Sequence, residues 1–300
     1  MAAHIAWLLN LDADLELQDP VSYRRAKLSA ERIHELEARV ADLIGADDAV
    51  LDAPGRAAIA TSPSTIAQAF CPTPRALARI VELGLRPPPA PPLAVLRRVN
   101  DRRFCAELGH GLAHACFALD MATLDQHLAR FAATTFVIKR AFSFAGREQR
   151  RVYGGVLDSS TRGFCMRSFE HGEGVQVEPW VERLADFSRH GYLTRAGDLL
   201  VGEPREQHCD AMGRFVRMST EPARVTEEEA ASLASTLRAT GEALAAAGYF
   251  GPFGIDGFRY RAPGQPDGHT AFNPRCEINA RFTMGYPRAL LLQGLRAEGC

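Results

Sequence analysis

The sequence predicts an α+β protein with more than one lobe, and two observations carry this prediction. Roughly the first 110 residues alternate between short apolar runs and amphipathic segments, a pattern typical of alternating strands and helices. The remainder is rich in β-branched runs separated by turn residues, which indicates antiparallel hairpins with covering helices. The chain has 300 residues, enough for one large domain or two to three small ones.

The first part of the chain reads as strands and helices joined by turns. Residues 4–17 indicate a short strand followed by a turn rich in aspartate, and Thr73 with Pro74 predicts the start of a helix that Gly84 ends. The prolines of residues 86–92 lack backbone donors, so this stretch is expected to be an extended crossing. Further helices are expected over residues 29–44, 93–108 and 121–131, with short strands at 49–52 and 57–60.

The second part of the chain is dominated by strand patterns. Thr226 with Glu229 forms a capping box, which predicts a helix that ends near Gly248. The two halves of the last predicted hairpin are residues 253–261 and 271–282, and a short helix is expected over 287–295. Other strands are expected at 134–139, 165–169 and 175–181, with a hairpin around 196–198.

Composition excludes several classes of partner. The 36 acidic and 35 basic residues give a formal charge of −1, so no overall electrostatic attraction to nucleic acid or to an anionic membrane is expected. No apolar run approaches the ~20 residues that span a bilayer, and the N-terminus lacks the basic start of a signal peptide. The 7 cysteines are scattered and contain no CxxC pair, which favours reduced thiols and a cytoplasmic location.

Lys139 is one of only two lysines in the chain, and it ends an apolar strand. A loop containing Ser143, Gly146 and Arg147 follows it. An ammonium, a hydroxyl and backbone N–H groups in this order can hold phosphates, although no GxxxxGK[ST] motif is present. The alternative is a strand-end lysine whose amine simply reaches water.

The last predicted hairpin carries a second polar group. Alternate residues of a strand share a face, so Arg275, Glu277, Asn279 and Arg281 are expected to project together, with Asp256 opposite or close to Glu277. Carboxylate and amide oxygens suit Mg²⁺, and the flanking arginines suit a polyphosphate. The alternative is a solvated sheet face with interleaved salt bridges.

A third group lies at the end of the strand over residues 175–181. Glu178 can accept from the exocyclic amine of a purine, and the backbone at Trp180 and Val181 can pair with the purine edge. The alternative is a strand that ends in a loop, with Trp180 anchoring a core.

The order of these three groups resembles the ATP-grasp superfamily, in its D-alanine–D-alanine ligase branch. The matching features are the strand-end lysine before a Gly/Ser loop, the E-x-W-V segment followed by Asp186-Phe187-Ser188, and the D…E-x-N-x-R hairpin, over roughly residues 100 to 285. The resemblance implies two α+β lobes that clasp ATP, preceded by an α/β lobe. The implied boundaries are 1–108 for the first lobe, 109–182 for a lid subdomain and 183–300 for a C-terminal subdomain.

The resemblance also implies a role for each matching residue. Asp186 or Glu182 would bind ribose, and Arg102 or Arg103 would replace a first-lobe lysine that this chain lacks. The family arginine two residues before the metal-binding aspartate is Gly254 here. The implied ATP ligands are Lys139, Ser143, Gly146, Arg147, Glu178, Trp180, Val181 and Asp186; the implied Mg²⁺ ligands are Asp256, Glu277 and Asn279; Arg281 and Arg275 would stabilise the transferring phosphoryl group.

The function implied by the resemblance is an ATP-dependent ligase that uses Mg²⁺ and joins a small carboxylate to an amine through an acyl phosphate. The implied partners are these small molecules and a second copy of the chain in a homodimer. Two alternatives stay open. One is an ATP-grasp kinase or phosphotransferase with a hydroxyl acceptor, and the other is an ATP-binding protein without catalysis.

Overall fold

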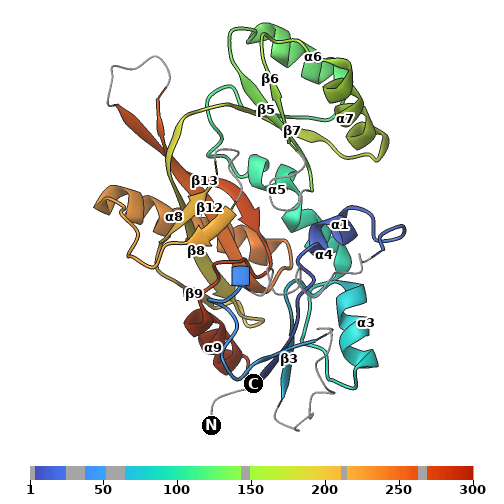
Figure 1. Ribbon diagram of the computed structural model, residues 1–300, viewed down its shortest axis with the longest axis vertical. Coiled ribbons are helices and arrows are strands. Elements are labelled where there is room, and N and C mark those ends of the chain that lie inside the picture. The colour runs from blue at the N-terminus through green and yellow to red at the C-terminus, as the bar shows by residue number, and fades with distance from the viewer. Residues whose placement is uncertain are drawn as a thin grey trace.

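The structure is a computed structural model that describes residues 4–24, 38–51, 65–142, 149–210, 215–262 and 269–299. These residues form three sheets with helices packed on them (Figure 1). Several sequence-based expectations lie outside the described residues: most of the helix over 29–44, the strand at 57–60, the loop residues Ser143, Gly146 and Arg147, and the turn of the last hairpin at 263–268.

The N-terminal lobe contains a parallel sheet in the order β2-β1-β3. Because side chains alternate along a strand, β1 (Ile5–Leu8) buries Ile5 and Trp7 on one face of the sheet and Ala6 and Leu8 on the other. The second face packs against α3 (Pro74–Glu82), and the first packs against α9 (Arg288–Ala297). The last helix of the chain therefore completes the core of the first lobe. The other two strands are β2 (Ala49–Val50) and β3 (Ile66–Ala69).

The expected helix over 93–108 is wrong in one respect, because it is two helices. The chain breaks between α4 (Leu93–Asn100) and α5 (Arg102–Glu107), where Asp101 is extended and its carboxylate accepts from the N–H of Arg103 at 2.8 Å. An N-cap of this kind starts a new helix in a new direction. The turn expected after β1 also contains a short helix, α1 (Ala13–Gln18), and β3 was not predicted.

A middle subdomain follows over residues 116–179. Its antiparallel sheet has the order β4-β7-β5-β6, and its own core includes Phe136, Ile138 and Phe164. Figure 1 shows α6 (Met121–Arg130) and α7 (Ser159–Glu170) on the outer side of this sheet. Its elements are β4 (Cys116–Ala118), α6 (Met121–Arg130), β5 (Phe136–Arg140), β6 (Gln149–Val152), α7 (Ser159–Glu170) and β7 (Val175–Pro179).

The strand expected at residues 165–169 is wrong, because these residues lie inside α7. Asp158 caps this helix by accepting from the N–H of Thr161 at 2.6 Å. Phe164 and Cys165 then pack inward on one side of the helix. The short segment was therefore part of a helical pattern that begins further upstream, at Ser159.

The C-terminal subdomain holds the longest strands. Its sheet has the order β11-β10-β8-β12-β13, with β9 also paired to β8. The helix α8 (Glu227–Ala246) begins with the predicted capping box of Thr226 and Glu229 and packs against this sheet. The strands are β8 (Arg183–Leu193), β9 (Leu199–Val201), β10 (Arg205–Cys209), β11 (Phe215–Met218), β12 (Gly251–Arg261) and β13 (Thr270–Asn279).

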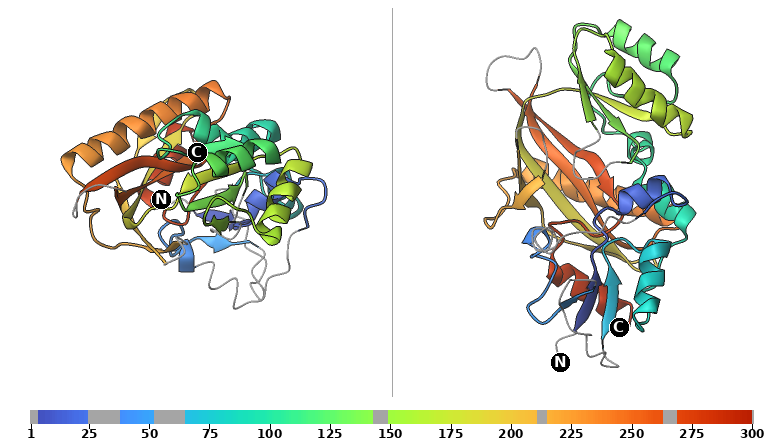
Figure 2. Two further views of the ribbon diagram at one scale, coloured as in Figure 1. Left: turned by 90° about the horizontal axis from the view of Figure 1, so that it is seen from above. Right: turned by 45° about the vertical axis from the view of Figure 1, so that its right-hand side comes forward.

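The N-terminal lobe and the C-terminal sheet share one core. Leu96 of α4 and Phe104 of α5 pack in the same cluster as Leu237 of α8 and Ile255 of β12. The middle subdomain has a separate core and stands to one side of this body (Figure 2). Among the described residues, no helix combines the length and apolar character needed to cross a bilayer.

Candidate active site

A cavity of about 710 Å³ lies between the middle sheet and the C-terminal sheet, with the N-terminal lobe at one end. Most of the side chains singled out from the sequence line it. They come from both sheets, so the fold brings together residues that are more than a hundred positions apart. These are Lys139, Glu178, Trp180, Val181, Asp186, Asp256, Glu277, Asn279 and Arg281.

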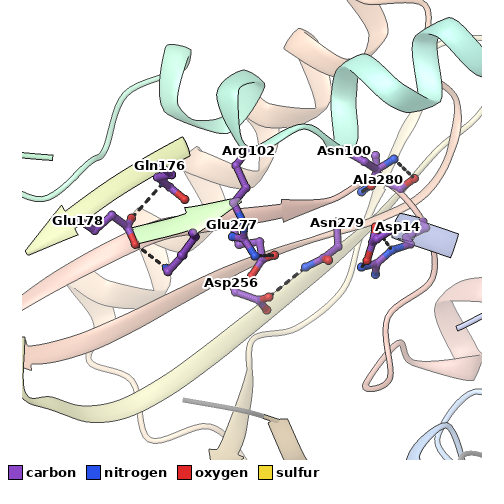
Figure 3. A network of polar contacts seen from close by, with 11 residues as sticks. Asp14, Asn100, Arg102, Gln176, Glu178, Asp256, Glu277, Asn279 and Ala280 are labelled. Carbon is purple, nitrogen blue, oxygen red and sulfur yellow. Dashed lines mark hydrogen bonds and ion pairs between the residues drawn. The ribbon is translucent and has the colours of Figure 1, made fainter. Parts of the chain in front are cut away.

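The middle sheet contributes a buried ion pair. In the pairing of β5 with β7, Lys139 stands opposite Gln176 and Val137 opposite Glu178, so all four side chains face the same way. Gln176 Nε2 donates to Glu178 Oε1 at 3.1 Å (Figure 3), and the Lys139 Nζ lies 2.5 Å from the other oxygen, Glu178 Oε2. Glu178 is only 3% exposed, so these two donors take the place of water around its carboxyl oxygens.

The C-terminal sheet contributes the oxygen-rich group. Asp256 of β12 pairs directly with Glu277 of β13, as the sequence predicted. Asn279 Nδ2 donates to Asp256 Oδ2 at 3.0 Å (Figure 3), and Gln207 Nε2 of β10 donates to the other oxygen, Asp256 Oδ1, at 2.6 Å. Gln207 was not singled out, because β10 was not predicted as a strand.

The two neighbouring carboxylates have pKa values displaced in opposite directions. Burial, together with the charge of Glu277, raises the pKa of Asp256 to about 7. Burial also acts on Glu277, but the charges of Arg102, Lys139 and Arg281 outweigh it and hold the pKa of Glu277 below its usual range. One carboxylate is therefore fixed as an anion, and the other titrates near neutral pH.

Arg102, and not Arg103, reaches the cavity. The Arg102 Nη2 lies 2.8 Å from Glu277 Oε1, and its side chain is 9% exposed (Figure 3). Arg103 instead pairs with Glu107 on the surface, where both side chains are more than half exposed. The helix break at Asp101 explains the difference, because it turns the first residue of α5 toward the sheet.

Arg281 connects the cavity to the N-terminal lobe. Its Nη2 lies 2.7 Å from Oδ2 of Asp14, a buried residue of α1. Asp14 was not singled out from the sequence. The aspartate-rich segment after β1 was the available signal, but nothing in it distinguished Asp14 from Asp12.

The expectation that Arg275 shares a face with Glu277 is wrong. Asp256 pairs with Glu277 but Phe258 pairs with Asn273, so Gly257 alone opposes three residues of β13. This bulge breaks the alternation and turns Arg275 toward the other side of the sheet. There its guanidinium donates to Thr240 Oγ1 at 2.9 Å and to the carbonyl of Gly109 at 3.1 Å.

Trp180 and Val181 follow directly after the end of β7. The indole of Trp180 is 37% exposed and stacks under the Arg151 guanidinium, 3.6 Å from the ring centre. The Trp180 N–H donates to the carbonyl of Thr135 at 2.7 Å. Trp180 therefore sits at the rim of the cavity, and the alternative that it anchors a core is wrong.

Both candidates for the ribose contact line the cavity, and each has an arginine partner. Asp186 accepts from Arg183 at 2.9 Å with 17% of its side chain exposed, whereas Glu182 accepts from Arg261 at 2.9 Å with 61% exposed. Asp186 is therefore the more enclosed of the two.

Several solved structures share this architecture. D-alanyl-alanine synthetase A from Vibrio cholerae matches 100% of this chain and 95% of its own length, with 13% identity and a TM-score of 0.51. N5-carboxyaminoimidazole ribonucleotide synthetase from Thermus thermophilus matches 94% of this chain and 72% of its own, with 18% identity and a TM-score of 0.50.

Carboxyaminoimidazole ribonucleotide synthase from Aspergillus clavatus, in a complex with ATP, covers 94% of this chain and 71% of its own, at 13% identity and a TM-score of 0.50. All three are ATP-grasp enzymes. The chain has the ATP-grasp fold. No family model matches the sequence, and no curated protein matches it either.

In the ATP-grasp fold found here, the middle subdomain and the C-terminal subdomain are the two α+β lobes, and the N-terminal lobe precedes them. Each of the three sheets falls inside one of the ranges 1–108, 109–182 and 183–300. The exact domain boundaries remain a prediction.

Proposed function

We propose that the protein is an ATP-dependent ligase that joins a small carboxylate to an amine through an acyl phosphate. The observation that carries the proposal is the composition of the cavity. A lysine–glutamate pair on one sheet faces two carboxylates, an amide and two arginines from elsewhere in the fold. All of them lie within an ATP-grasp architecture.

The middle sheet would bind the nucleotide. On ATP binding, the Lys139 ammonium would turn from Glu178 to the phosphates, and Glu178 would accept from the adenine amine. This exchange keeps every buried charge paired. Trp180 and Val181 at the rim would contact the adenine edge, Asp186 would bind ribose, and the loop with Ser143, Gly146 and Arg147 would cover the phosphates.

The C-terminal sheet would hold Mg²⁺ with the phosphates. Two carboxylates and an amide are the oxygen ligands that this ion prefers. The raised pKa of Asp256 is consistent with the assignment, because the repulsion from Glu277 that contributes to it would be relieved by a bound cation. Asp256, Glu277 and Asn279 would hold the ion, which when bound would neutralise charge on the transferring phosphoryl group.

Arg281 and Arg102 would stabilise the phosphoryl group during transfer. The Arg102 guanidinium pairs with Glu277, and Arg281 lines the same cavity. Both side chains stay positively charged at any physiological pH. Because the two guanidiniums are already in position, they would not have to move when the transition state forms. Asp14 would fix the position of Arg281 through its ion pair.

The reaction follows in two balanced steps. A carboxylate oxygen attacks the γ-phosphorus, the bond to the bridging β–γ oxygen breaks, and ADP leaves. The amine nitrogen then attacks the carbonyl carbon of the acyl phosphate, loses a proton, and inorganic phosphate leaves with formation of the amide. The protein would act by positioning and by charge stabilisation rather than by forming a covalent intermediate.

A trap for the acyl phosphate tests the proposal. The purified protein is incubated with MgATP, hydroxylamine and a panel of small carboxylic acids, and ADP and hydroxamate are measured together. We expect equal amounts of both with at least one acid, and neither with Glu277→Gln. ADP formed with a phosphorylated alcohol and no hydroxamate would indicate a kinase, whereas ATP binding without turnover would favour a silent binding protein.

The remaining attributes follow from this proposal and from the sequence. Small carboxylates and amines are the proposed partners, with a second copy of the chain in a homodimer. A cytoplasmic location is proposed from the reduced state expected of the cysteines, of which Cys71, Cys105 and Cys165 are buried and unpaired.

A further inference from the structure

A second cavity lies on the other side of the middle sheet from the proposed nucleotide site. Its volume is about 460 Å³. We call it the junction cavity, because its wall comes from two parts of the fold. The N-terminal lobe contributes residues 18–21 and Arg97, and the middle subdomain contributes Arg140, Arg167, His171 and Glu173.

Three arginines from three elements meet in this cavity. Arg97 comes from α4, Arg140 from the end of β5, and Arg167 from the last turn of α7. Arg140 follows Lys139 directly, so strand alternation turns it to the opposite face, where its guanidinium lies 4.5 Å from the centre of the Phe164 ring. Arginine charge is independent of physiological pH, so the cavity holds three permanent positive charges.

The acidic residues in the wall are already engaged by neutral donors. The Asp19 carboxylate accepts from the N–H groups of Val21 and Ser22, at 3.2 and 2.9 Å. The Glu173 carboxylate accepts from Gln18 Nε2 at 3.0 Å. Burial raises the pKa of Glu173, which weakens its contribution as a counter-charge.

Neither Arg97 nor Arg167 forms an ion pair among the described residues, although Arg97 lies close enough to Glu173 to act on its charge. Arg97 donates to the carbonyl of Gln18 at 3.3 Å. The side chain of Arg167 is exposed, and among the described parts of the chain it contacts no hydrogen-bonding or charged partner. A cation in the last turn of a helix is favourable by itself, by about 0.3–1 kcal/mol. That effect does not account for guanidiniums from a helix, a strand and a second helix in one cavity.

We propose that the junction cavity binds a small anion bearing phosphate or carboxylate groups. Guanidinium groups recognise both through paired N–H donors. The anion would contact Arg97 on the N-terminal lobe and Arg167 on the middle subdomain, and so link the two parts beside the Gln18–Glu173 hydrogen bond. The site is separate from the proposed ATP site, and the proposal does not depend on the proposed activity.

Calorimetric titration of the full chain tests the proposal, with inorganic phosphate in one arm and succinate in the other. Ionic strength is held constant with sodium chloride. We expect saturable binding of one equivalent of at least one of these anions, and the tighter arm identifies the chemical source. Arg167→Gln and Arg97→Gln should each weaken it at least tenfold, because each removes one charge-assisted contact.

The matched control is Arg162→Gln, a substitution on the same helix at a residue that pairs with Asp125 on the surface. It should leave the affinity unchanged. Arg167 is exposed, so its variant should fold like the wild type, which circular dichroism checks. Absence of saturable binding in both arms would overturn the proposal. So would binding that persists unchanged in Arg167→Gln, because the anion would then occupy another site.

Discussion

Asp256 and Glu277 are neighbours on adjacent strands, yet the groups that contact their carboxylates differ in charge. Glu277 has a guanidinium at 2.8 Å, whereas the hydrogen-bond donors that reach Asp256 are two neutral amides. Burial and the repulsion between the two carboxylates therefore raise the pKa of Asp256, whereas the pKa of Glu277 stays below its usual range. This buried carboxylate therefore costs the folded protein stability when it is ionised.

The first prediction concerns the pH dependence of stability. The pKa of Asp256 is about 7 in the folded protein against an ordinary 3.8. Between about pH 4 and pH 7 the folded state therefore holds a proton that the unfolded state has released, so its stability falls as the pH rises over this range and levels off above pH 7. Asp256→Asn cannot ionise, and its amide partners Gln207 and Asn279 can flip to suit it. We expect the variant to gain about 1 kcal/mol or more of unfolding free energy over wild type at pH 8.

At pH 5 the gain should be smaller than at pH 8, because the wild type loses this stability progressively between about pH 4, where the unfolded carboxyl ionises, and pH 7, where the folded one does. Urea unfolding at the two pH values measures both effects. A variant that is equally destabilised at pH 5 and pH 8 would contradict the account of this carboxylate.

The second prediction compares two adjacent arginines. Arg102→Ala leaves Glu277 without its nearest cation. Removing one partner of a fully buried pair costs roughly 3–5 kcal/mol, and since Glu277 keeps 32% of its side chain exposed, we expect about 2 kcal/mol. Arg103→Ala should change the unfolding free energy by less than about 0.5 kcal/mol, because its pair with Glu107 is on the surface. Equal effects in urea unfolding would show that the assignment of Arg102 to the cavity is incorrect.

At the scale of single residues, strand alternation predicted much of the site. It placed Asp256 opposite Glu277 and put Asn279 beside them, because β pairing has a fixed period of two. It failed for Arg275, since a bulge is not visible in the alternation of apolar and polar residues. It also could not identify Asp14, whose role depends on how the first lobe docks on the last strand.

At the scale of elements, the bulge between β12 and β13 decides which side chains reach the cavity. Gly257 opposes residues 274–276, so Cys276 and Glu277 both line the cavity although they are consecutive. A Cβ at Gly257 would lie 2.7 Å from the carbonyl oxygen of Asn273 and 2.9 Å from that of Pro274. Backbone atoms cannot move aside as a flexible side chain can, so only glycine fits this bulge.

The third prediction therefore concerns Gly257→Ala. The added methyl forces the two strands apart, and we expect a loss of about 1–3 kcal/mol of unfolding free energy. The control is Gly163→Ala in α7, where the nearest atom to a Cβ is an Arg167 side-chain nitrogen at 3.6 Å. That variant should gain about 0.5–1 kcal/mol from helix propensity. A neutral result for Gly257→Ala in the same thermal unfolding assay would mean that the bulge is not tightly packed.

Elements with local start and stop signals were predicted best. The helix that begins at Glu227 follows from its capping box, the helix that begins at Pro74 follows from the proline in its first turn, and the last hairpin follows from alternation. The strand expected at 165–169 failed because a five-residue segment with three apolar residues fits a buried helix equally well. The break at Asp101 was missed because an aspartate inside a helical pattern is only a weak stop signal.

At the scale of the whole molecule, the packing divides the chain into two bodies. One combines the first and last parts of the sequence, and the other is the middle subdomain. Trp7 near the N-terminus packs with Tyr286 near the C-terminus, and Asn100 exchanges hydrogen bonds with the backbone of Ala280 at 2.9 and 3.3 Å. The middle subdomain has its own core. Composition and local pattern could indicate several lobes, but not that the first and last parts of the chain share a core.

The fourth prediction is that the middle subdomain opens independently. Native-state hydrogen exchange should show the amides of β5 and β7 exchanging through an opening of lower free energy than those of β8 and β12, because the middle core is smaller and separate. The β1 amides should behave like those of β12. A single common opening free energy for all three sheets would contradict this division.

The ATP site is the central claim, and calorimetric titration of MgATP into the full chain tests it most directly. We compare wild type with Lys139→Met, which keeps the buried stem but removes the charge, and with Lys139→Met/Glu178→Gln, which leaves no buried charge unpaired. Arg162→Gln is the control. We predict saturable binding that weakens without Mg²⁺ and falls at least tenfold, about 1.4 kcal/mol, in both lysine variants. Folded wild-type protein that binds no ATP, or that binds it equally well without Lys139, would contradict the account.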